Sequence, residues 1–333
     1  MTATRRGVAL TPMETRHDVI VRAAQLADEL GYEAFAVPEG WGFDSTLLLG
    51  ELALHTRRIT LVSAILSVWG RTPATLAMTA ATLYRLAQGR YVLGLGTSTR
   101  ALVEGFHDVA FERPADKLRE VTTKVRALLA GERAQLDNGA AARPLRLGLP
   151  PVPQLPIWLA ALGGRTSRVA AELGDGWIPV FVSADRLAER VADLGRARRA
   201  AGLRSGPLTV AAGPWTVADA DAGAARGVVA GCVAWYLVAM GDVYGRTVAG
   251  QGHGGAVEAV NAANPRPRPQ AGTVPAEARV LLDEFTAHGT PGQVREQLER
   301  WDGVADVTMV ALPPGMAWDA VEATLRAAAP APG

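Results

Sequence analysis

Residues 59–98 read ITLVSAILSVWGRTPATLAMTAATLYRLAQGRYVLGLGTS, and this stretch decides the fold. Two short apolar runs, Ile59–Leu66 and Tyr91–Leu95, predict strands, and apolar side chains at three- and four-residue spacing predict a helix over Pro73–Ala87. Strand, helix and strand in this order are typical of one parallel βαβ unit. The second strand runs directly into Gly96-Thr97-Ser98, a small-residue turn suited to binding an anion.

The same alternation of short strands and helices recurs along the 333-residue chain. Further strands are predicted over Gly7–Leu10, Glu33–Val37, Ile157–Ala161, Trp177–Val180, Leu208–Ala212 and Val304–Leu312. Further helices are predicted over Thr15–Leu30, Thr46–His55, Asp116–Ala130, Thr166–Leu173 and Asp185–Ala201. Eight strands separated by helices predict an α/β fold, the (β/α)₈ TIM barrel. An open doubly wound sheet is the alternative, and it is disfavoured because no G-x-G-x-x-G turn follows the first strand.

The chain is expected to form one domain over residues 1–326. Residues from about 215 to 300 exceed one barrel repeat, so an insertion is predicted between the seventh and eighth strands, with Asn264–Pro269 as an exposed linker. Ala134–Pro156 is predicted to be a long surface loop. The Ala- and Pro-rich residues 327–333 are expected to be a frayed tail.

Composition and charge exclude several classes of function. The formal net charge is +1, so neither nucleic acid nor an anionic membrane is an expected partner. Cys232 is the only cysteine and the histidines lack metal-ligand spacing, so neither a disulfide within the chain nor a metal site is expected. The only lysines, Lys117 and Lys124, fall in a predicted surface helix, which argues against Schiff-base chemistry. No signal-peptide core or uncharged apolar run of about 18 residues is present, so a cytoplasmic location is expected.

Two loops have the composition of a phosphate cradle. One is Gly96-Thr97-Ser98, and the other is Leu162–Ser167, which includes Gly163, Gly164 and Arg165 and leads into a predicted helix. Small residues let backbone N–H groups approach an anion, and a helix N-terminus adds partial positive charge. Both loops follow strands, where barrel active sites lie. The alternative is that the glycines only form tight turns.

Four segments, spread in order over roughly Gly7–Leu312, share a recognisable pattern. They are RTPATLAMTAATL…GRYVLGLGTS, FHDVAFERP, PIWLAALGGRTSRVAAELGDGWIP and GTPGQVREQLERW. Together they resemble the bacterial luciferase-like monooxygenase superfamily, most closely its actinobacterial branch that uses the deazaflavin coenzyme F420. The resemblance is weakest over Asp242–Gly272. It implies a TIM barrel that binds a flavin-like cofactor at the carboxyl face of its strands.

The resemblance also implies where the cofactor lies. The cofactor phosphate would lie against Gly96–Ser98 and Gly163–Gly164, with Arg165 beside them. A non-prolyl cis peptide bond would occur at Ala64–Ile65 and bulge against the deazaflavin ring. An ordinary trans strand is the alternative at that bond.

The loop after the second strand, VPEGWGFD, departs from the family pattern. The family often places a histidine after the acidic residue, whereas here Gly40 follows Glu39, so Glu39 becomes a catalytic candidate. Trp41 could form a wall for a planar ring. Asp44 is expected to cap the following helix.

Two further loops carry candidates. His107 could donate a proton or hold a substrate oxygen, although a lone loop histidine is more often simply exposed. Arg71, close to Trp69, could pair with a carboxylate on the cofactor or substrate, and a surface ion pair is the alternative. The apolar run Trp235–Met240 resembles a family segment near the substrate pocket or subunit contact, and core packing is the alternative.

These observations predict an oxidoreductase that transfers a hydride between coenzyme F420 and a small organic substrate. An FMN-dependent monooxygenase that uses oxygen is the first alternative. A barrel without redox activity that serves as a binding protein is the second. A homodimer is expected.

Overall fold

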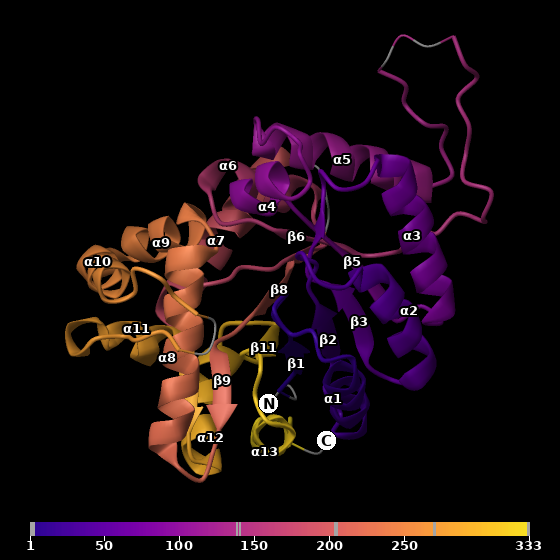
Figure 1. Cartoon of the computed structure of the whole chain (residues 1–333). Helices are drawn as coiled ribbons and strands as arrows, with labels where there is room; N and C mark the ends of the chain where they lie inside the picture. Colours follow the sequence, from indigo (N-terminus) through magenta and orange to yellow (C-terminus); the bar gives the residue numbers. More distant parts are fainter. Residues whose placement is uncertain (1–3, 138, 140, 203–205, 269–270, 332–333) are drawn as a thin grey trace.

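The computed structural model describes residues 4–137, 139, 141–202, 206–268 and 271–331. Within this part of the chain, eight parallel strands form a closed ring (Figure 1). In ring order they are β1 (Arg6–Ala9), β2 (Ala34–Val37), β3 (Thr60–Ser63), β5 (Tyr91–Gly96), β6 (Ile157–Ala160), β7 (Gly176–Trp177), β8 (Thr209–Ala212) and β11 (Val307–Ala311). The ring closes because β1 pairs with β2 on one side and with β11 on the other. The predicted TIM barrel is therefore confirmed, and each ring strand overlaps a strand predicted from the sequence.

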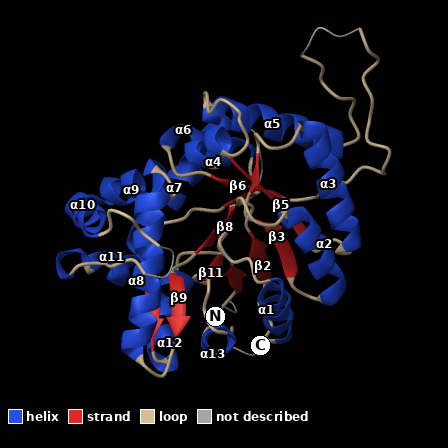
Figure 2. Ribbon diagram, in the orientation of Figure 1, coloured by secondary structure: helices blue, strands red, loops and turns tan. Residues whose placement is uncertain are grey.

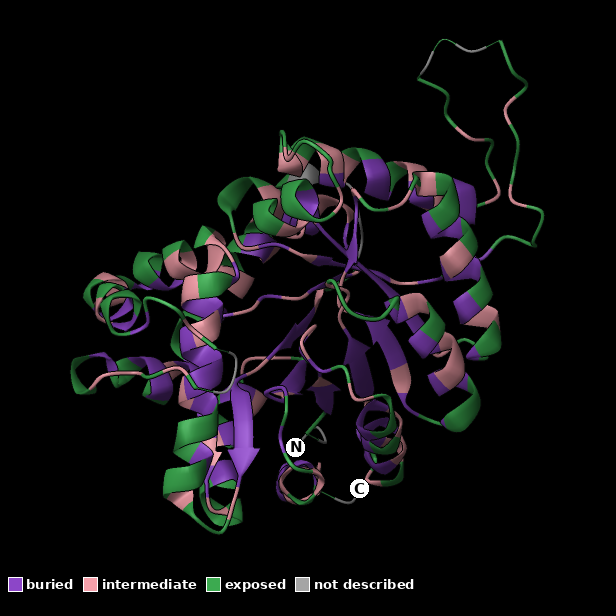
Figure 3. Ribbon diagram, viewed as in Figure 1, coloured by how far each residue is buried: buried purple, intermediate pink, exposed green. Residues whose placement is uncertain are grey.

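Helices surround the ring and join its strands (Figure 2). They include α1 (His17–Glu29), α2 (Ser45–His55), α3 (Pro73–Leu86), α4 (Arg100–Gly105), α5 (Pro114–Leu129), α6 (Gly164–Leu173), α7 (Ala184–Ala201) and α13 (Trp318–Ala327). The side chain of Asp44 accepts a hydrogen bond from the Thr46 N–H at 2.9 Å, which confirms its predicted role as the cap of α2. Figure 3 shows that the ring strands are buried, whereas the helices expose their outer faces.

The third barrel strand is interrupted. The sequence predicts one strand over Ile59–Leu66, but the structure has two, β3 and β4 (Leu66–Ser67), separated by the cis peptide bond Ala64–Ile65. The cis bond implied by the family resemblance is thus present. Strand β5 accommodates this segment through two glycines. A Cβ atom at Gly94 would lie 1.8 Å from the Ser63 carbonyl oxygen, and one at Gly96 would lie 2.8 Å from Ile65 Cγ1. Neither position has room for a side chain.

The segment between β8 and β11 contains more regular structure than the sequence predicted. It holds β9 (Trp215–Ala218), α8 (Ala222–Ala239), α9 (Asp242–Val248), η1 (Ala249–His253), α10 (Gly254–Ala263), η2 (Ala276–Ala278), α11 (Val280–Phe285), β10 (Thr286–Gly289) and α12 (Pro291–Asp302). The sequence did not reveal β9 and β10, which pair with each other, and Trp215 of β9 pairs with Ala311 of β11. They therefore extend the sheet outside the ring.

Helix α8 is long and apolar enough to cross a membrane by length and composition alone. It packs against β9 and β10, and its buried residues, among them Val229, Cys232 and Leu237, belong to the hydrophobic core. Asn264–Pro269 was predicted to be an exposed linker, but its first residue is not exposed. Asn264 is buried, and its side chain closes the loop by bonding the N–H and the carbonyl of Thr273. Residues 265, 266 and 268 are exposed as expected, and 269 lies outside the described residues.

The prediction that residues 327–333 form a frayed tail is wrong for the first two of them. Ala327 and Ala328 are buried, and the carbonyl of Ala328 accepts a hydrogen bond from Arg6 Nη1 at 3.2 Å. Arg6 also forms an ion pair with Asp302 at 2.5 Å. Residues 332–333 lie outside the described residues. Ala327 and Ala328 can be buried there because alanine is small enough to pack closely against the barrel. The expected surface loop between α5 and β6 does extend away from the barrel (Figure 1).

Candidate active site

Two connected cavities lie at the carboxyl ends of the barrel strands. The inner cavity has a volume of about 160 Å³ and the outer groove about 520 Å³. The residues that line both are Ile65, Ser98, Thr99, Ile178, Val180 and Tyr244. The inner cavity and the outer groove therefore form one continuous site. This is the end of the barrel at which TIM-barrel active sites lie.

The walls of the inner cavity are mostly apolar and aromatic. Its aromatic residues are Trp158, Phe181, Trp215, Tyr236, Tyr244, Phe285 and Trp301. Among the described residues that line it, Glu39 is the only one with a formal charge. A single carboxylate in apolar surroundings can take part in proton transfer or orient a substrate.

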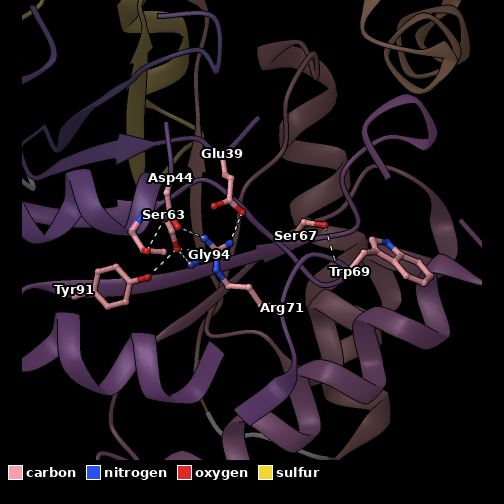
Figure 4. Close-up of polar contacts among 9 residues, drawn as sticks. Glu39, Asp44, Ser63, Ser67, Trp69, Arg71, Tyr91 and Gly94 are labelled. Atoms are coloured by element: carbon pink, nitrogen blue, oxygen red, sulfur yellow. Dashed lines mark hydrogen bonds and ion pairs between the residues drawn. The ribbon is translucent and has the colours of Figure 1, made fainter. Parts of the chain in front are cut away.

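Glu39 is held by Arg71, which follows β4 (Figure 4). Arg71 Nη1 lies 2.6 Å from Glu39 Oε2, and Arg71 Nη2 lies 3.0 Å from Asp44 Oδ2. The Glu39 side chain is 10% exposed and the Asp44 side chain is 46% exposed. The sequence left two roles possible for Arg71, a contact with a ligand and a surface ion pair. The structure shows an ion pair at the edge of the site.

The charges of this group affect one another. Burial alone would raise the pKa of Asp44, but hydrogen bonds from Thr46 and the charge of Arg71 lower it. Burial alone would lower the pKa of Arg71, but its contacts with Glu39 and Asp44 raise it. The guanidinium therefore stays charged between the two carboxylates.

A buried polar network joins the interrupted strand to β5 (Figure 4). Ser63 Oγ accepts a hydrogen bond from the Gly94 N–H at 2.9 Å and lies 3.0 Å from the Tyr91 hydroxyl. Nearby, the Trp69 indole N–H donates to the Thr97 carbonyl at 3.1 Å. These bonds tie the segment after β3 to β5 and to the first small-residue loop.

The outer groove brings the two predicted loops together. Gly96, Thr97 and Ser98 line it from one side, and Gly163 and Thr166 from the loop and first turn at the start of α6. Gly164 and Arg165 are not among its described lining residues.

Two arginines that the sequence analysis did not single out also line the outer groove. Arg100 belongs to α4 and Arg246 to α9. Each pairs with a carboxylate on its own helix, Glu104 and Asp242 respectively. No helix was predicted over α4, because six residues are too few to show a repeating pattern.

The chain is similar to known proteins over most of its length. Residues 1–306 match the model of the luciferase-like monooxygenase family. The chain belongs to this family. A Mycobacterium tuberculosis relative named as a coenzyme F420-dependent oxidoreductase is 31% identical over 318 residues, which is 87% of this chain and 89% of the relative.

Solved structures support the same fold for this luciferase-like protein. The coenzyme F420-dependent tetrahydromethanopterin reductase from Methanopyrus kandleri has a TM-score of 0.75 and 20% identity, covering 96% of this chain and 97% of that one. A type II Baeyer–Villiger monooxygenase, the oxygenating constituent of 3,6-diketocamphane monooxygenase from Pseudomonas putida, was solved with FMN. Its TM-score is 0.69 and its identity 16%, covering 98% of each chain.

Besides Gly164 and Arg165, two residues that the sequence predicted for the luciferase-like site, Trp41 and His107, lie outside both cavities as described. Trp41 is an exposed residue on the loop after β2. His107 lies after α4, and its ring is near Gly70 and in edge contact with Phe106. Ala64 and Ile65, by contrast, both line the inner cavity.

The structure contains an aromatic cluster that the sequence did not predict, formed by Phe181, Trp215, Tyr236, Tyr244 and Phe285. Its members come from the loop after β7 and from β9, α8, α9 and α11. Phe181 has a φ of +55°, a conformation rare for a bulky residue. Gln251 fixes this turn by donating to the Phe181 carbonyl at 2.7 Å and accepting from the Ser183 N–H at 3.0 Å. No local pattern predicts contacts among such distant segments, although Trp235–Met240 was noted.

Proposed function

We propose that this luciferase-like protein is an oxidoreductase that uses coenzyme F420 and transfers a hydride between the coenzyme and a small organic substrate. The observation that carries the proposal is the division of the site into an apolar inner cavity and an outer groove lined by small-residue loops and arginines. This division suits a cofactor with a planar ring and a phosphate-bearing tail. The 31% identical relative favours F420, and the FMN-bound structure makes FMN the alternative.

The residues of the outer groove fit an anionic tail. Gly163 precedes α6 without any side-chain cap, so the first N–H groups of the helix are free of a capping side chain. A Cβ atom at Gly163 would meet only Thr166 Oγ1, at 3.7 Å, so the backbone is open to a ligand. Arg100 and Arg246 bring guanidinium donors to the same groove, each paired with a carboxylate of its own helix, and Asp242 lines the groove beside Arg246.

The ring would lie where the two cavities meet. Ile65, Ser98 and Tyr244 line both, and could hold a planar group between them. The bound ring supplies hydride chemistry. The chain's own residues would orient the substrate and exclude water from the inner cavity, and Glu39 would take up or release a proton there.

Fluorescence titration of the purified protein with F420 and with FMN tests the proposal. We expect a dissociation constant at least tenfold lower for F420. Tighter binding of FMN would replace the proposal with an oxygen-using monooxygenase. If a protein that is folded by circular dichroism binds neither, the barrel acts without redox chemistry, as a binding protein.

We also infer that two copies of the chain associate and that they act in the cytoplasm. Leu47 and Leu54 on α2, and Met78 and Leu86 on α3, are exposed, and these two helices pack side by side. Exposed apolar side chains on adjacent helices favour a protein interface. The buried free thiol of Cys232 is compatible with a reducing compartment.

A further inference from the structure

The aromatic cluster forms one wall of the inner cavity, and each member lines that cavity. The ring of Phe181 lies at its centre, 5.8 Å from the rings of Tyr236, Tyr244 and Phe285 and 6.0 Å from Trp215. The rings of Trp215 and Tyr236 are 4.8 Å apart. Packed rings of this kind give a rigid, mainly apolar surface.

Two tyrosine hydroxyls in this wall have no hydrogen-bond partner within the described part of the chain. They belong to Tyr236, which is 5% exposed, and Tyr244, which is half-buried, and neither oxygen is among the fully buried polar atoms that lack a partner. An accessible hydroxyl at a cavity wall, without a partner in the described residues, is free to donate to a ligand that enters the cavity. Burial raises the pKa of Tyr244 to about 12 and that of Tyr236 well above its usual value. Both therefore stay protonated and able to donate.

The two tyrosines lie at different places in the site, so we assign them different roles. Tyr244 lines the outer groove as well as the inner cavity, whereas Tyr236 lines only the inner cavity. Tyr236 is therefore the hydroxyl on the side away from the two small-residue loops.

The charge of the inner cavity limits what can bind beside Tyr236. Arg71 already neutralises Glu39, the one charged lining residue among those described. A charged ligand would have to lose its water among aromatic rings without a free counter-charge, which is unfavourable. A neutral ligand meets no such cost.

We propose that the inner cavity binds a neutral, mainly apolar ketone or alcohol whose oxygen is hydrogen-bonded to the Tyr236 hydroxyl. The proposal rests on the proposed function, because it identifies the substrate class of the same site. It makes Tyr236 the residue that recognises the substrate oxygen.

Calorimetric titration of the cofactor-free protein with cyclohexanone and with cyclohexanecarboxylate tests the substrate class. The two probes share a ring and differ in charge. We expect cyclohexanone to bind and the carboxylate to bind at least tenfold more weakly. Equal or tighter binding of the carboxylate, or no binding of the ketone, would overturn the proposal.

The variant Tyr236→Phe tests the hydrogen bond, and Tyr244→Phe tests whether the second hydroxyl of the wall makes that bond instead. One neutral hydrogen bond corresponds to roughly 3–10-fold in the dissociation constant, so Tyr236→Phe should weaken cyclohexanone binding by about that factor and more than Tyr244→Phe does. The infrared carbonyl stretch of bound cyclohexanone should lie at lower frequency in the parent than in Tyr236→Phe. An unchanged affinity and stretch in Tyr236→Phe would overturn the role of Tyr236. If Tyr236→Phe does not fold, the parent alone decides. A carbonyl stretching frequency of bound cyclohexanone equal to that of cyclohexanone in an apolar solvent would then overturn the role of Tyr236.

These measurements need no cofactor, so they separate the two proposals. Ketone binding without F420 binding would refute the proposed function alone. F420 binding without ketone binding would refute the substrate class alone.

Discussion

Glu39 pairs with an arginine that lies far from it in the sequence. The sequence placed it at the end of a strand, beside Gly40 where the family often has histidine. The structure adds that Glu39 reaches the inner cavity and that Arg71 holds it, a contact between positions 32 residues apart. A short motif cannot reveal such a partner. His107 was an equal candidate, and the fold of the loop after α4 places it outside the described lining.

The role of Glu39 can be tested with its neighbour as the control. If Glu39 transfers a proton, Glu39→Gln should lower single-turnover rates by ~10²–10⁴-fold and leave F420 affinity within twofold. The control is Asp44→Asn, which removes the other carboxylate that pairs with Arg71. Asp44 does not line the inner cavity as described, and asparagine can still cap a helix. This variant should stay within a few-fold of the parent. A loss confined to His107→Ala would instead assign proton transfer to His107.

At the scale of elements, the sequence predicted the ring well because its strands are short apolar runs buried on both faces, whereas its helices bury one apolar face. Every ring strand was predicted to within a few residues. Among the elements that were not predicted are α4, β9 and β10, of six, four and four residues. Such short segments carry too few residues to show periodicity, and tertiary pairing determines them. The two small-residue loops were predicted to share a site because each follows a ring strand, and both line the outer groove.

The start of α6 offers a test at this scale. Gly163→Asp should weaken F420 binding at least tenfold, because its carboxylate would face the cofactor phosphate. The fold should persist, since aspartate is favourable before a helix. Gly163→Asn is the matched control, with the same shape and no charge, and should retain much more of the affinity. Equal affinity of the aspartate variant and the parent would place the phosphate elsewhere.

The whole molecule exposes apolar side chains that its own fold does not cover. Leu54 on α2 is 74% exposed, and Leu145, on the loop between α5 and β6, is 72% exposed. The inferred dimer would bury Leu54 and leave Leu145 free. Light scattering should therefore give twice the chain mass for the parent and for Leu145→Glu, but the monomer mass for Leu54→Glu. A monomeric parent, or a Leu54→Glu variant that remains dimeric, would contradict association through α2 and α3.

The pairing of β1 with β11 also has a consequence for synthesis of the protein. The ribosome releases β1 first, but its partner β11 and the Arg6 contacts at Asp302 and Ala328 come from the far end of the chain. Such distant pairing slows folding, and an unpaired strand edge invites association with other chains. During translation the nascent barrel therefore carries two open edges, at β1 and at β8, until β11 emerges, which makes this the period in which it most needs protection by chaperones.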